Sequence, residues 1–465
     1  MTERFQQLRP ALLEVLDNDG LLTGSDVAQR SDCWPGREPS RALAVMLPRN
    51  TTQVSQLLHL CHAAGQPVVT QGGRTGLVHG TETASDEIIL SLERMTAIED
   101  CNPQAATITV QAGVPLQSVQ ELAEQHGLMF PLDLGSRGSC TIGGNIATNA
   151  GGMRVIRYGM TRQQVLGLEV VLADGTVLDS MNRMIKNNAG YDLKQLFIGS
   201  EGTLGVITRA VLRLQPLPGS EQNALLAVPS FNALTRLLHS LNRELGGRLS
   251  AFEVMWQSHY RTVAVESGKH IPPLPADQPW YVMVEALGSE PLHDAEQFER
   301  VLAQMLEQEL AVDAVIAQSR AQRDSLWAIR EDIPSIVAAM MPPVSFDVSL
   351  PIEAMERYVQ GVEQALREQF GERGKLLVFG HLGDGNLHLV TSVGDASAET
   401  RRAIEQLVYT PLQALGGSVS AEHGIGLEKR DYLQLSRTPE EIALMQLLKR
   451  SLDPKGLLNP GKVIA

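Results

Sequence analysis

Two kinds of hydrophobic periodicity divide the chain into stretches of different expected architecture. From about residue 42 to 218, short β-branched runs such as "QPVVTQGG" and "ATITVQAGV" alternate with helical patterns, and "VLGLEVVLADGTVLD" predicts two strands joined by a turn at Asp174-Gly175. Residues 220–380 mix long amphipathic helices, such as "HDAEQFERVLAQMLEQEL", with strands such as "WYVMVEALG" and "VSFDVSLPI". A helix followed by a loop is predicted for the first 35 residues. The last sixty are predicted to be mostly helical, with an irregular tail.

These patterns predict an α+β protein with more than one domain. A chain of 465 residues is too long for one ordinary core. Glycine is dense up to "LQPLPG" (Leu214–Gly219) and sparse after it. We therefore expect one domain over residues 1–218, a second over 219–405, and a C-terminal segment over 406–465.

Composition and charge exclude several classes of partner. The net charge of −14 disfavours nucleic acid and anionic membranes, because neither attracts an acidic surface. No run of 18 apolar residues occurs, so we expect no transmembrane segment, and the N-terminus lacks the apolar core of a secretory signal. The four cysteines, Cys33, Cys61, Cys101 and Cys140, show no CxxC spacing, which favours a reducing compartment. The predicted location is the cytoplasm.

Three glycine-rich loops in the first domain indicate a large phosphorylated ligand. They are "TQGGRTGLVHG", "PLDLGSRGSCTIGGNIATNAGG" and "FIGSEGTLGVIT". Successive backbone N–H groups without side chains can surround a pyrophosphate, and the small hydroxyls and amides of the second loop suit a flat polar ligand. Neither a Rossmann nor a Walker motif is present in the first loop. Any one loop could be only a set of tight turns, but three in one domain favour a cofactor.

The three loops resemble the FAD-binding domain of the vanillyl-alcohol oxidase superfamily. From about residue 40 to the C-terminus the chain is similar to the D-2-hydroxyacid dehydrogenases, which include D-2-hydroxyglutarate dehydrogenase, D-lactate dehydrogenase and the glycolate oxidase flavin subunit. The resemblance implies an FAD-binding domain of two α+β subdomains over 1–218 and an α+β substrate (cap) domain over 219–405. The segment 406–465 would then complete the active site and the flavin pocket. Members with covalent flavin carry a histidine after the paired glycines; "QGGRTG" has none, so we expect non-covalent FAD.

The same resemblance implies a set of cofactor contacts. The FAD pyrophosphate is expected at the first loop, the isoalloxazine near the second and the adenosine half near the third. The implied contacts are Pro67, Gly72, Gly73, Arg74, Thr75, Gly76, Leu77, Pro131, Gly135, Ser136, Thr141, Gly143, Gly144, Asn145, Thr148, Asn149, Gly151, Gly152, Glu201, Gly202, Gly205, Ile207 and Asn459.

The stretch "HLGDGNLHLV" places two histidines on either side of a predicted turn. With Gly383–Asn386 turning, His381 would lie opposite His388, with Cβ atoms about 5 Å apart. Residue pattern alone leaves open whether they are packed core histidines or metal ligands. "SAEHGIG" adds Glu422 and His423, and a carboxylate with two imidazoles is a usual ligand set for catalytic zinc. The family resemblance implies His381, His388 and Glu422 as ligands of one divalent metal, with Zn²⁺ as the expected ion, and His423 as catalytic base.

The substrate contacts implied by the resemblance are Arg330, Asn386 and Ser345, with Arg330 gripping a carboxylate. By residue pattern alone, Arg330 could instead form a helix-surface ion pair with Glu331 or Asp332. The hydroxyglutarate enzymes usually carry a lysine where this chain has Ser345, and Pro334 and Val390 also replace polar residues. We expect D-2-hydroxyglutarate as substrate, with D-lactate or another small D-2-hydroxy acid as competitor.

The expected reaction is a metal-assisted oxidation. The metal lowers the pKa of the substrate hydroxyl, His423 takes the proton, and the hydride goes to flavin N5. Electrons then leave to a separate acceptor such as an electron-transfer flavoprotein or a quinone, and the resemblance suggests a homodimer. Two other functions remain open: a metallohydrolase with a nucleotide substrate, and a non-catalytic flavoprotein subunit.

Overall fold

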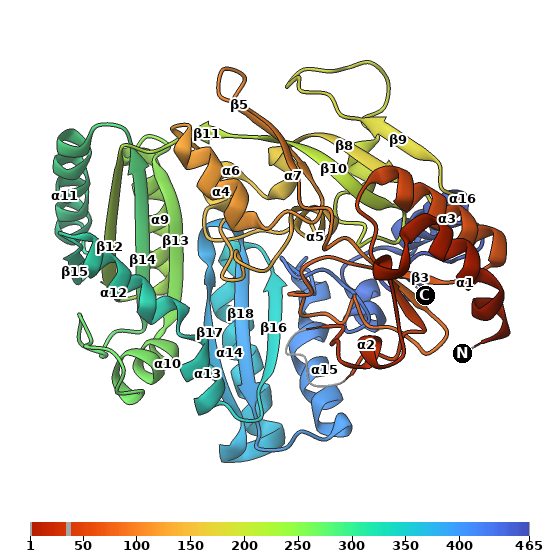
Figure 1. Cartoon of the computed structure of the whole chain (residues 1–465). Coiled ribbons are helices and arrows are strands. Elements are labelled where there is room, and N and C mark those ends of the chain that lie inside the picture. Colours follow the sequence, from red (N-terminus) through yellow and green to blue (C-terminus); the bar gives the residue numbers. More distant parts are fainter. Residues whose placement is uncertain (1, 34–38, 465) are drawn as a thin grey trace. The chain divides into compact units, whose positions relative to one another are not determined.

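The computed structural model describes residues 2–33 and 39–464 and divides the chain into two compact units (Figure 1). Unit 1 contains the described residues of Met1–Gly152, Gly159–Leu217 and Glu422–Ala465, and unit 2 contains Met153–Tyr158 and Pro218–Ala421. One division point, at 217/218, falls within the "LQPLPG" stretch. The last segment joins unit 1 only from Glu422, because α15 (Ala398–Ala414) runs through residue 405 and belongs to unit 2.

The first sheet of unit 1 has the order β1-β2-β4-β3. Its strands are β1 (Leu21–Thr23), β2 (Ala44–Met46), β3 (Val68–Gln71) and β4 (Ile88–Ser91); the β2–β4 and β3–β4 pairs are parallel. Helix α3 (Thr51–Ala64) makes the crossover that parallel pairing requires. Asn50 caps its start and Gly65, with φ +65°, ends it, while Val54, Leu57, Leu58 and Cys61 form its buried stripe. Helices α1 (Glu3–Leu16) and α2 (Ser25–Ala28) complete this subdomain.

The second sheet of unit 1 has the order β5-β6-β10-β8-β9 and is antiparallel throughout. Its strands are β5 (Ile98–Asn102), β6 (Thr107–Gln111), β8 (Val165–Val171), β9 (Val177–Ser180) and β10 (Val206–Arg213). The predicted turn between β8 and β9 is confirmed, with Gly175 at φ +90°. The other elements of this unit are α4 (Leu116–Gln125), β7 (Leu128–Met129), α5 (Ile142–Ala147), α7 (Thr161–Gln164), α8 (Lys194–Phe197), β11 (Gln215–Pro216) and α16 (Pro439–Leu452).

Unit 2 is built on one seven-stranded antiparallel sheet of order β15-β12-β14-β13-β17-β18-β16. The strands are β12 (Ser220–Val228), β13 (Leu249–Trp256), β14 (Trp280–Gly288), β15 (Asp313–Ile316), β16 (Val344–Ser349), β17 (Lys375–His381) and β18 (Asn386–Ser392). The helices are α6 (Val155–Tyr158), α9 (Phe231–Glu244), α10 (Gln257–Tyr260), α11 (Pro291–Glu307), α12 (Arg320–Glu331), α13 (Ile333–Ala339), α14 (Met355–Phe370) and α15.

The two faces of this sheet have different roles. Helices α9 and α11 contact β12 on one face (Figure 1). The opposite face carries Leu225, Met255, Met283 and Phe379, which form a core with α10 and α12. Because side chains alternate along a strand, residues two positions from these point to the same α12-covered face. His381 and Glu253, two positions from Phe379 and Met255, therefore belong to this face. The predicted α+β class is confirmed.

Candidate functional site

The three glycine-rich loops of unit 1 line one pocket. The empty space within it is about 950 Å³, the part open to solvent included. The first loop follows β3, the second runs into α5, and the third leads into β10. The pocket therefore lies where both sheets of unit 1 present their strand ends.

The glycines of these loops are required by close backbone approach. A Cβ on Gly73 would lie 2.1 Å from the carbonyl oxygen of Ser139, and one on Gly72 would lie 2.5 Å from Thr141 Oγ1. A Cβ on Gly143 would lie 2.6 Å from the side chain of Ala112, at the end of β6. A side chain at any of these positions would push the first and second loops apart and change the pocket wall.

Two threonine hydroxyls in the pocket wall are left for a ligand. Thr70 Oγ1 and Thr141 Oγ1 are buried, and neither has a hydrogen-bond partner among the described residues. A buried hydroxyl without a partner costs free energy, so such atoms usually serve a ligand or an ordered water. Close-packed glycines and unpaired hydroxyls together fit a phosphorylated cofactor such as FAD.

Glu201 ties the C-terminal segment to this pocket. Its carboxylate accepts backbone N–H groups from Ile425 at 2.7 Å and Gly426 at 2.8 Å. Burial raises the pKa of Glu201, while these two N–H donors and Lys429 oppose the rise. Asn459 accepts from Thr70 N at 2.8 Å and donates to the Glu201 carbonyl at 2.6 Å. This bonding holds residues 424–426 in place, and His423, immediately before them, is part of the pocket wall.

Most of the predicted cofactor contacts lie in the pocket wall. These are Gly72, Gly73, Arg74, Thr75, Gly76, Thr141, Gly143, Gly144, Asn145, Thr148, Glu201, Gly202, Gly205, Ile207 and Asn459. The wall does not include Pro67, Leu77, Pro131, Gly135, Ser136, Asn149, Gly151 and Gly152. Asn149, for example, accepts a hydrogen bond from Arg162 N at 2.9 Å and so holds the loop together. Their contact with a cofactor stays a prediction.

Sequence reasoning missed several wall residues. They are Thr70, Val78, Gly80, Thr81, Leu92, Ala112, Cys140, Ala147 and Val206. Some of them adjoin the quoted glycines and could have been included on that ground. Leu92 and Ala112 each follow a strand directly, and only the sheet pairing brings them to the pocket.

In unit 2 the two histidines lie on one hairpin, but the predicted register is wrong. His388 pairs with Phe379 and not with His381. Residues Leu382–Asp384 form a 3₁₀ turn and Gly385 has φ +88°, so β18 already begins at Asn386. The error is two residues, and an even shift keeps both imidazoles on the same face. Their rings are 5.2 Å apart between centroids, with an interplanar angle of 82°.

A buried carboxylate, Glu253, joins His381 to Arg330. Glu253 is opposite His381 in the β13–β17 ladder and is 0% exposed. Its Oε1 lies 2.6 Å from His381 Nδ1, and its Oε2 lies 2.8 Å from Arg330 Nη2. The guanidinium of Arg330 also lies 4.6 Å from the ring centroid of Phe379. Arg330 therefore does not form the helix-surface ion pair with Glu331 or Asp332 that the residue pattern alone had left open. It is a buried cation on the sheet face that α12 covers.

The other predicted substrate contacts lie on the same hairpin and its neighbour strand. Asn386 is 3% exposed, and neither its amide nitrogen nor its amide oxygen has a hydrogen-bond partner among the described residues. Ser345 is exposed and pairs with Val390, and two residues further Asp347 pairs with His388. Ala421 donates its backbone N–H to Asp347 Oδ2 at 3.2 Å.

Glu422 and His423 begin the last segment of unit 1, whereas His381 and His388 belong to unit 2. The predicted ligand set therefore draws on both units and stays a prediction. Sequence reasoning missed Glu253 in this region. A single carboxylate inside the apolar strand "LSAFEVMW" was the available signal, because a charge in a buried strand needs a partner.

Comparison with known proteins places the chain in a family. A family model described as "FAD linked oxidases, C-terminal domain" matches residues 217–463, and one described as "FAD binding domain" matches residues 42–180. Solved structures with the same fold include p-cresol methylhydroxylase (14% identity, TM-score 0.78, 100% of this chain and 97% of the other). They also include an alkyldihydroxyacetonephosphate synthase (17% identity, TM-score 0.74, 98% and 85%). The class of protein is that of the FAD-linked oxidases with the vanillyl-alcohol oxidase fold.

Sequence relatives narrow this class. The chain is 42% identical to "D-2-hydroxyglutarate dehydrogenase, mitochondrial" of Bos taurus, over 90% of this chain and 76% of that protein. It is 41% identical to the D-2-hydroxyglutarate dehydrogenase of Xanthomonas citri pv. viticola, over 92% and 91%. It is 38% identical to a putative mitochondrial D-lactate dehydrogenase of Schizosaccharomyces pombe, over 93% and 83%. The chain therefore belongs to the FAD-dependent D-2-hydroxyacid dehydrogenase family.

The predicted cytoplasmic location is contradicted by these comparisons. Relatives from Bos taurus, Oryza sativa, Arabidopsis thaliana and Rattus norvegicus are named as mitochondrial. The spacing of the cysteines indicates the redox environment, and the net charge describes the protein surface. Neither property distinguishes the cytoplasm from the mitochondrion. Within residues 2–33 and 39–464, no helix has both the length and the apolar character that crossing a membrane would need.

Proposed function

We propose that this protein oxidises a D-2-hydroxy acid, D-2-hydroxyglutarate first among them, to the 2-oxo acid with non-covalently bound FAD and one divalent metal. The observation that carries the proposal is the position of His423 in the wall of the glycine-loop pocket. A titratable imidazole that shares a wall with the proposed flavin loops suits a base that works beside a redox cofactor. Relatives named for this activity cover nearly the whole chain.

The first and second glycine loops would hold FAD. Gly72 and Gly73 keep the backbone open to the phosphates, and the hydroxyls of Thr70 and Thr141 are available to hydrogen-bond the cofactor. When bound, the flavin supplies a hydride acceptor. Asn459 and Glu201 keep the C-terminal segment closed on this pocket.

His381, His388 and Glu422 would hold the metal, for which we propose Zn²⁺. Glu253 accepts the Nδ1–H of His381, which leaves the lone pair of this imidazole on Nε2, as in other metal-ligating histidines. Ala421 is hydrogen-bonded to Asp347, the cross-strand neighbour of His388, and Glu422 is the next residue in the chain. When bound, the metal supplies Lewis acidity that lowers the pKa of the substrate hydroxyl.

Arg330, Asn386 and Ser345 would orient the substrate. Arg330 Nε and both amide atoms of Asn386 have no hydrogen-bond partner among the described residues, although both side chains are buried. The two N–H donors suit a carboxylate, and the amide oxygen of Asn386 suits a hydroxyl. His423 would take the hydroxyl proton as the C2 hydride leaves. Electrons would pass to a separate acceptor such as an electron-transfer flavoprotein or a quinone, and the working form would be a homodimer.

One observation favours a smaller substrate such as D-lactate as second candidate. Val390 is buried beside Ser345, and Pro334 lies in the first turn of α13. Neither side chain has a hydrogen-bond donor for a second carboxylate. The putative D-lactate dehydrogenase among the relatives agrees with this candidate.

An anaerobic titration of the purified protein tests the proposal. D-2-hydroxyglutarate, D-lactate and their L forms are added while the flavin absorbance is followed, and we expect one D form to bleach it. His423→Asn should retain its FAD and lose roughly 10²- to 10⁴-fold in the bleaching rate. A colourless protein that binds no added FAD would favour the metallohydrolase. A flavin that no hydroxy acid reduces, with Zn²⁺ supplied, would favour the non-catalytic subunit.

A further inference from the structure

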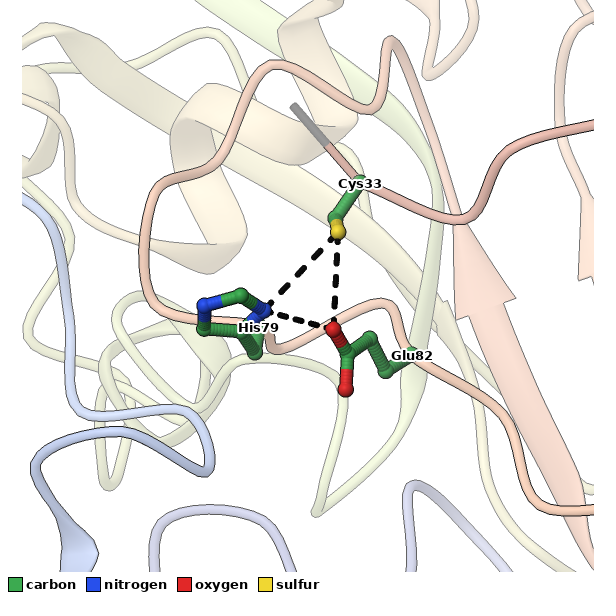
Figure 2. Close-up of side chains that lie close together, drawn as sticks. All are labelled: Cys33, His79 and Glu82. Atoms are coloured by element: carbon green, nitrogen blue, oxygen red, sulfur yellow. Dashed lines mark hydrogen bonds and ion pairs between the residues drawn. The ribbon is translucent and has the colours of Figure 1, made fainter. Parts of the chain in front are cut away.

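A second group of side chains of metal-ligating types lies in unit 1, whereas the hairpin histidines belong to unit 2. Cys33, His79 and Glu82 converge on one point (Figure 2). Cys33 Sγ lies 3.8 Å from His79 Nδ1 and 3.6 Å from Glu82 Oε1, and His79 Nδ1 lies 2.6 Å from Glu82 Oε1. None of the three is used in the proposed oxidation.

The distances suit one small cation. Ligands at about 2.0–2.3 Å from a tetrahedral zinc ion lie about 3.3–3.8 Å from one another. Both distances of Cys33 Sγ match this spacing. The shorter contact between His79 and Glu82 is the hydrogen bond that a cation inserted between them would replace.

A second carboxylate orients the imidazole. Glu428 Oε2 lies 3.5 Å from His79 Nε2, on the side of the ring away from Cys33 and Glu82. Without a cation, the hydrogen bond to Glu82 needs the proton on Nδ1. A cation bound at Nδ1 would displace this proton, and Glu428 would then accept the Nε2–H of the metal-bound imidazole. His79 itself has φ +58°, a conformation that non-glycine residues seldom adopt without support from their surroundings.

The strand ends around the cluster are held by their own bonds. Asp32 is buried and accepts from Gln71 Nε2 at 3.2 Å and from Thr83 N at 3.1 Å. Arg74 donates to the Ser31 carbonyl at 3.0 Å. The segment that ends at Cys33 is therefore fixed against the loop that carries His79 and Glu82, and the three ligand atoms meet without a large rearrangement.

We infer that Cys33, His79 and Glu82 form a binding site for a zinc-class divalent cation, separate from the proposed catalytic metal. A thiolate with an imidazole and a carboxylate selects Zn²⁺ or Co²⁺ over Mg²⁺ and Ca²⁺, which prefer oxygen ligands alone. The side chains of His79 and Glu82 are 39% and 44% exposed, so solvent supplies the fourth ligand and the cation can enter. Binding would clamp residue 33 to a loop whose residues Val78, Gly80 and Thr81 line the flavin pocket.

Cobalt is the probe that distinguishes this site from the hairpin histidines, because only this site has a thiolate ligand. The full-length protein is dialysed against chelator and titrated with Co²⁺, and difference spectra are recorded at constant flavin content. We expect a thiolate-to-cobalt charge-transfer band that saturates by two added equivalents, because the proposed hairpin site also takes up Co²⁺, and by one equivalent in His381→Ala. The band should be absent in Cys33→Ser and weakened at least tenfold in apparent affinity in His79→Ala.

Two control variants fix the assignment. Cys101→Ser removes the half-buried thiol of β5 and should keep the band. His381→Ala should also keep it, because this histidine belongs to the other proposed metal site. As a second readout, Zn²⁺ should raise the thermal midpoint of His381→Ala but not that of the double variant with Cys33→Ser. The inference is overturned if no thiolate–cobalt band forms in the wild type, or if the band survives in Cys33→Ser.

Discussion

Glu253 shows how one buried side chain can organise a candidate site. It lies between His381, to which it is hydrogen-bonded at 2.6 Å, and Arg330, with which it forms an ion pair at 2.8 Å. Its own strand offers no compensating cation, so the pairing depends on residues more than 70 positions away in the chain. The carboxylate both neutralises Arg330 and sets the ring orientation of His381.

We therefore predict that Glu253→Gln lowers the free energy of unfolding by about 3 kcal/mol, because it leaves the Arg330 cation buried without a counter-charge. Zinc affinity of the proposed hairpin site should fall roughly 10- to 100-fold, since the proposed ligand His381 loses its carboxylate partner. Chemical denaturation measures the first effect, and metal titration in a Cys33→Ser background, which removes the other proposed zinc site, measures the second. Glu363→Gln, which removes an exposed ion pair with Arg367 on α14, is the matched control and should cost under about 1 kcal/mol. Wild-type stability and affinity in Glu253→Gln would show that the triad has no such role.

His259 is a second residue whose environment decides its chemistry. It is fully buried on α10, and its ring lies 4.7 Å from that of Phe379. Burial, with help from the charge of Arg330 and against that of Asp332, lowers the pKa of His259 to about 3. The imidazole of His259 therefore stays neutral in the folded protein at mildly acidic pH, where the same imidazole in the unfolded chain becomes protonated.

The sign of the pH effect follows from this difference. Above the unfolded pKa of about 6.5 neither state binds the proton, and below it only the unfolded state does, so stability falls with acidity down to the folded pKa. Between pH 7 and pH 5 the loss is about 2 kcal/mol. We predict that His259→Leu removes this loss. On going from pH 7 to pH 5, the free energy of unfolding of the variant should therefore rise by that amount relative to that of the wild type. Urea unfolding at both pH values measures it, and a pH-independent difference would contradict the assignment.

At the scale of elements, the glycine loops depend on backbone proximity more than on side-chain chemistry. The turn after β3 and the loop before α5 approach so closely that a Cβ on Gly73 would overlap the Ser139 carbonyl. The antiparallel hairpin β17–β18 is a second example, since its 3₁₀ turn sets which residues face each other. In both, the connecting backbone decides the geometry of the functional side chains.

Gly73→Ala is expected to abolish FAD retention, because the new Cβ would lie 2.1 Å from the Ser139 oxygen and the loops must separate. The control is Gly138→Ala in the same loop region, where the nearest atom is the end of the Gln117 side chain at 3.2 Å. Flavin content after gel filtration measures both variants. Equal FAD content in the two would mean that the loops tolerate the separation.

At the scale of the whole molecule, unit 1 is assembled from distant parts of the chain. Its last segment, from Glu422, supplies the Leu457 carbonyl that accepts from Val68 N at 2.8 Å, at the start of β3. It also supplies Lys449, which donates to the carbonyls of Thr203 and Leu458. We therefore do not expect residues 1–217 of the chain, produced alone, to form the whole of unit 1.

A chain ended after Ala421 should consequently lose FAD and unfold at lower temperature. The expected cause is the loss of Asn459 and the Glu201 contacts from the pocket wall. Asn459→Ala is the matched point variant: it removes two hydrogen bonds worth about 1 kcal/mol each, and should weaken FAD binding while the protein stays folded. Flavin content and thermal unfolding are the measurements. Full FAD content in the truncated chain would contradict the assigned role of the segment.

The sequence by itself determined the α+β class, the main helices and strands, and the family. Alternation, capping residues and turn glycines act locally, so "VLGLEVVLADGTVLD" was sufficient for β8 and β9. The glycine loops were recognisable because only glycine permits such close backbone approach, and most of their predicted cofactor contacts line the pocket.

Only the tertiary structure decided the register of the histidine hairpin, the partner of Arg330 and the Cys33–His79–Glu82 group. A 3₁₀ turn shifts pairing by two residues without a clear sequence signal. Glu253 and Arg330 are 77 residues apart in sequence, and Cys33 and His79 are 46 apart. Such contacts depend on sheet order and crossover connections, which hydrophobic periodicity does not encode, because it reports which face of an element is buried and not which element covers it.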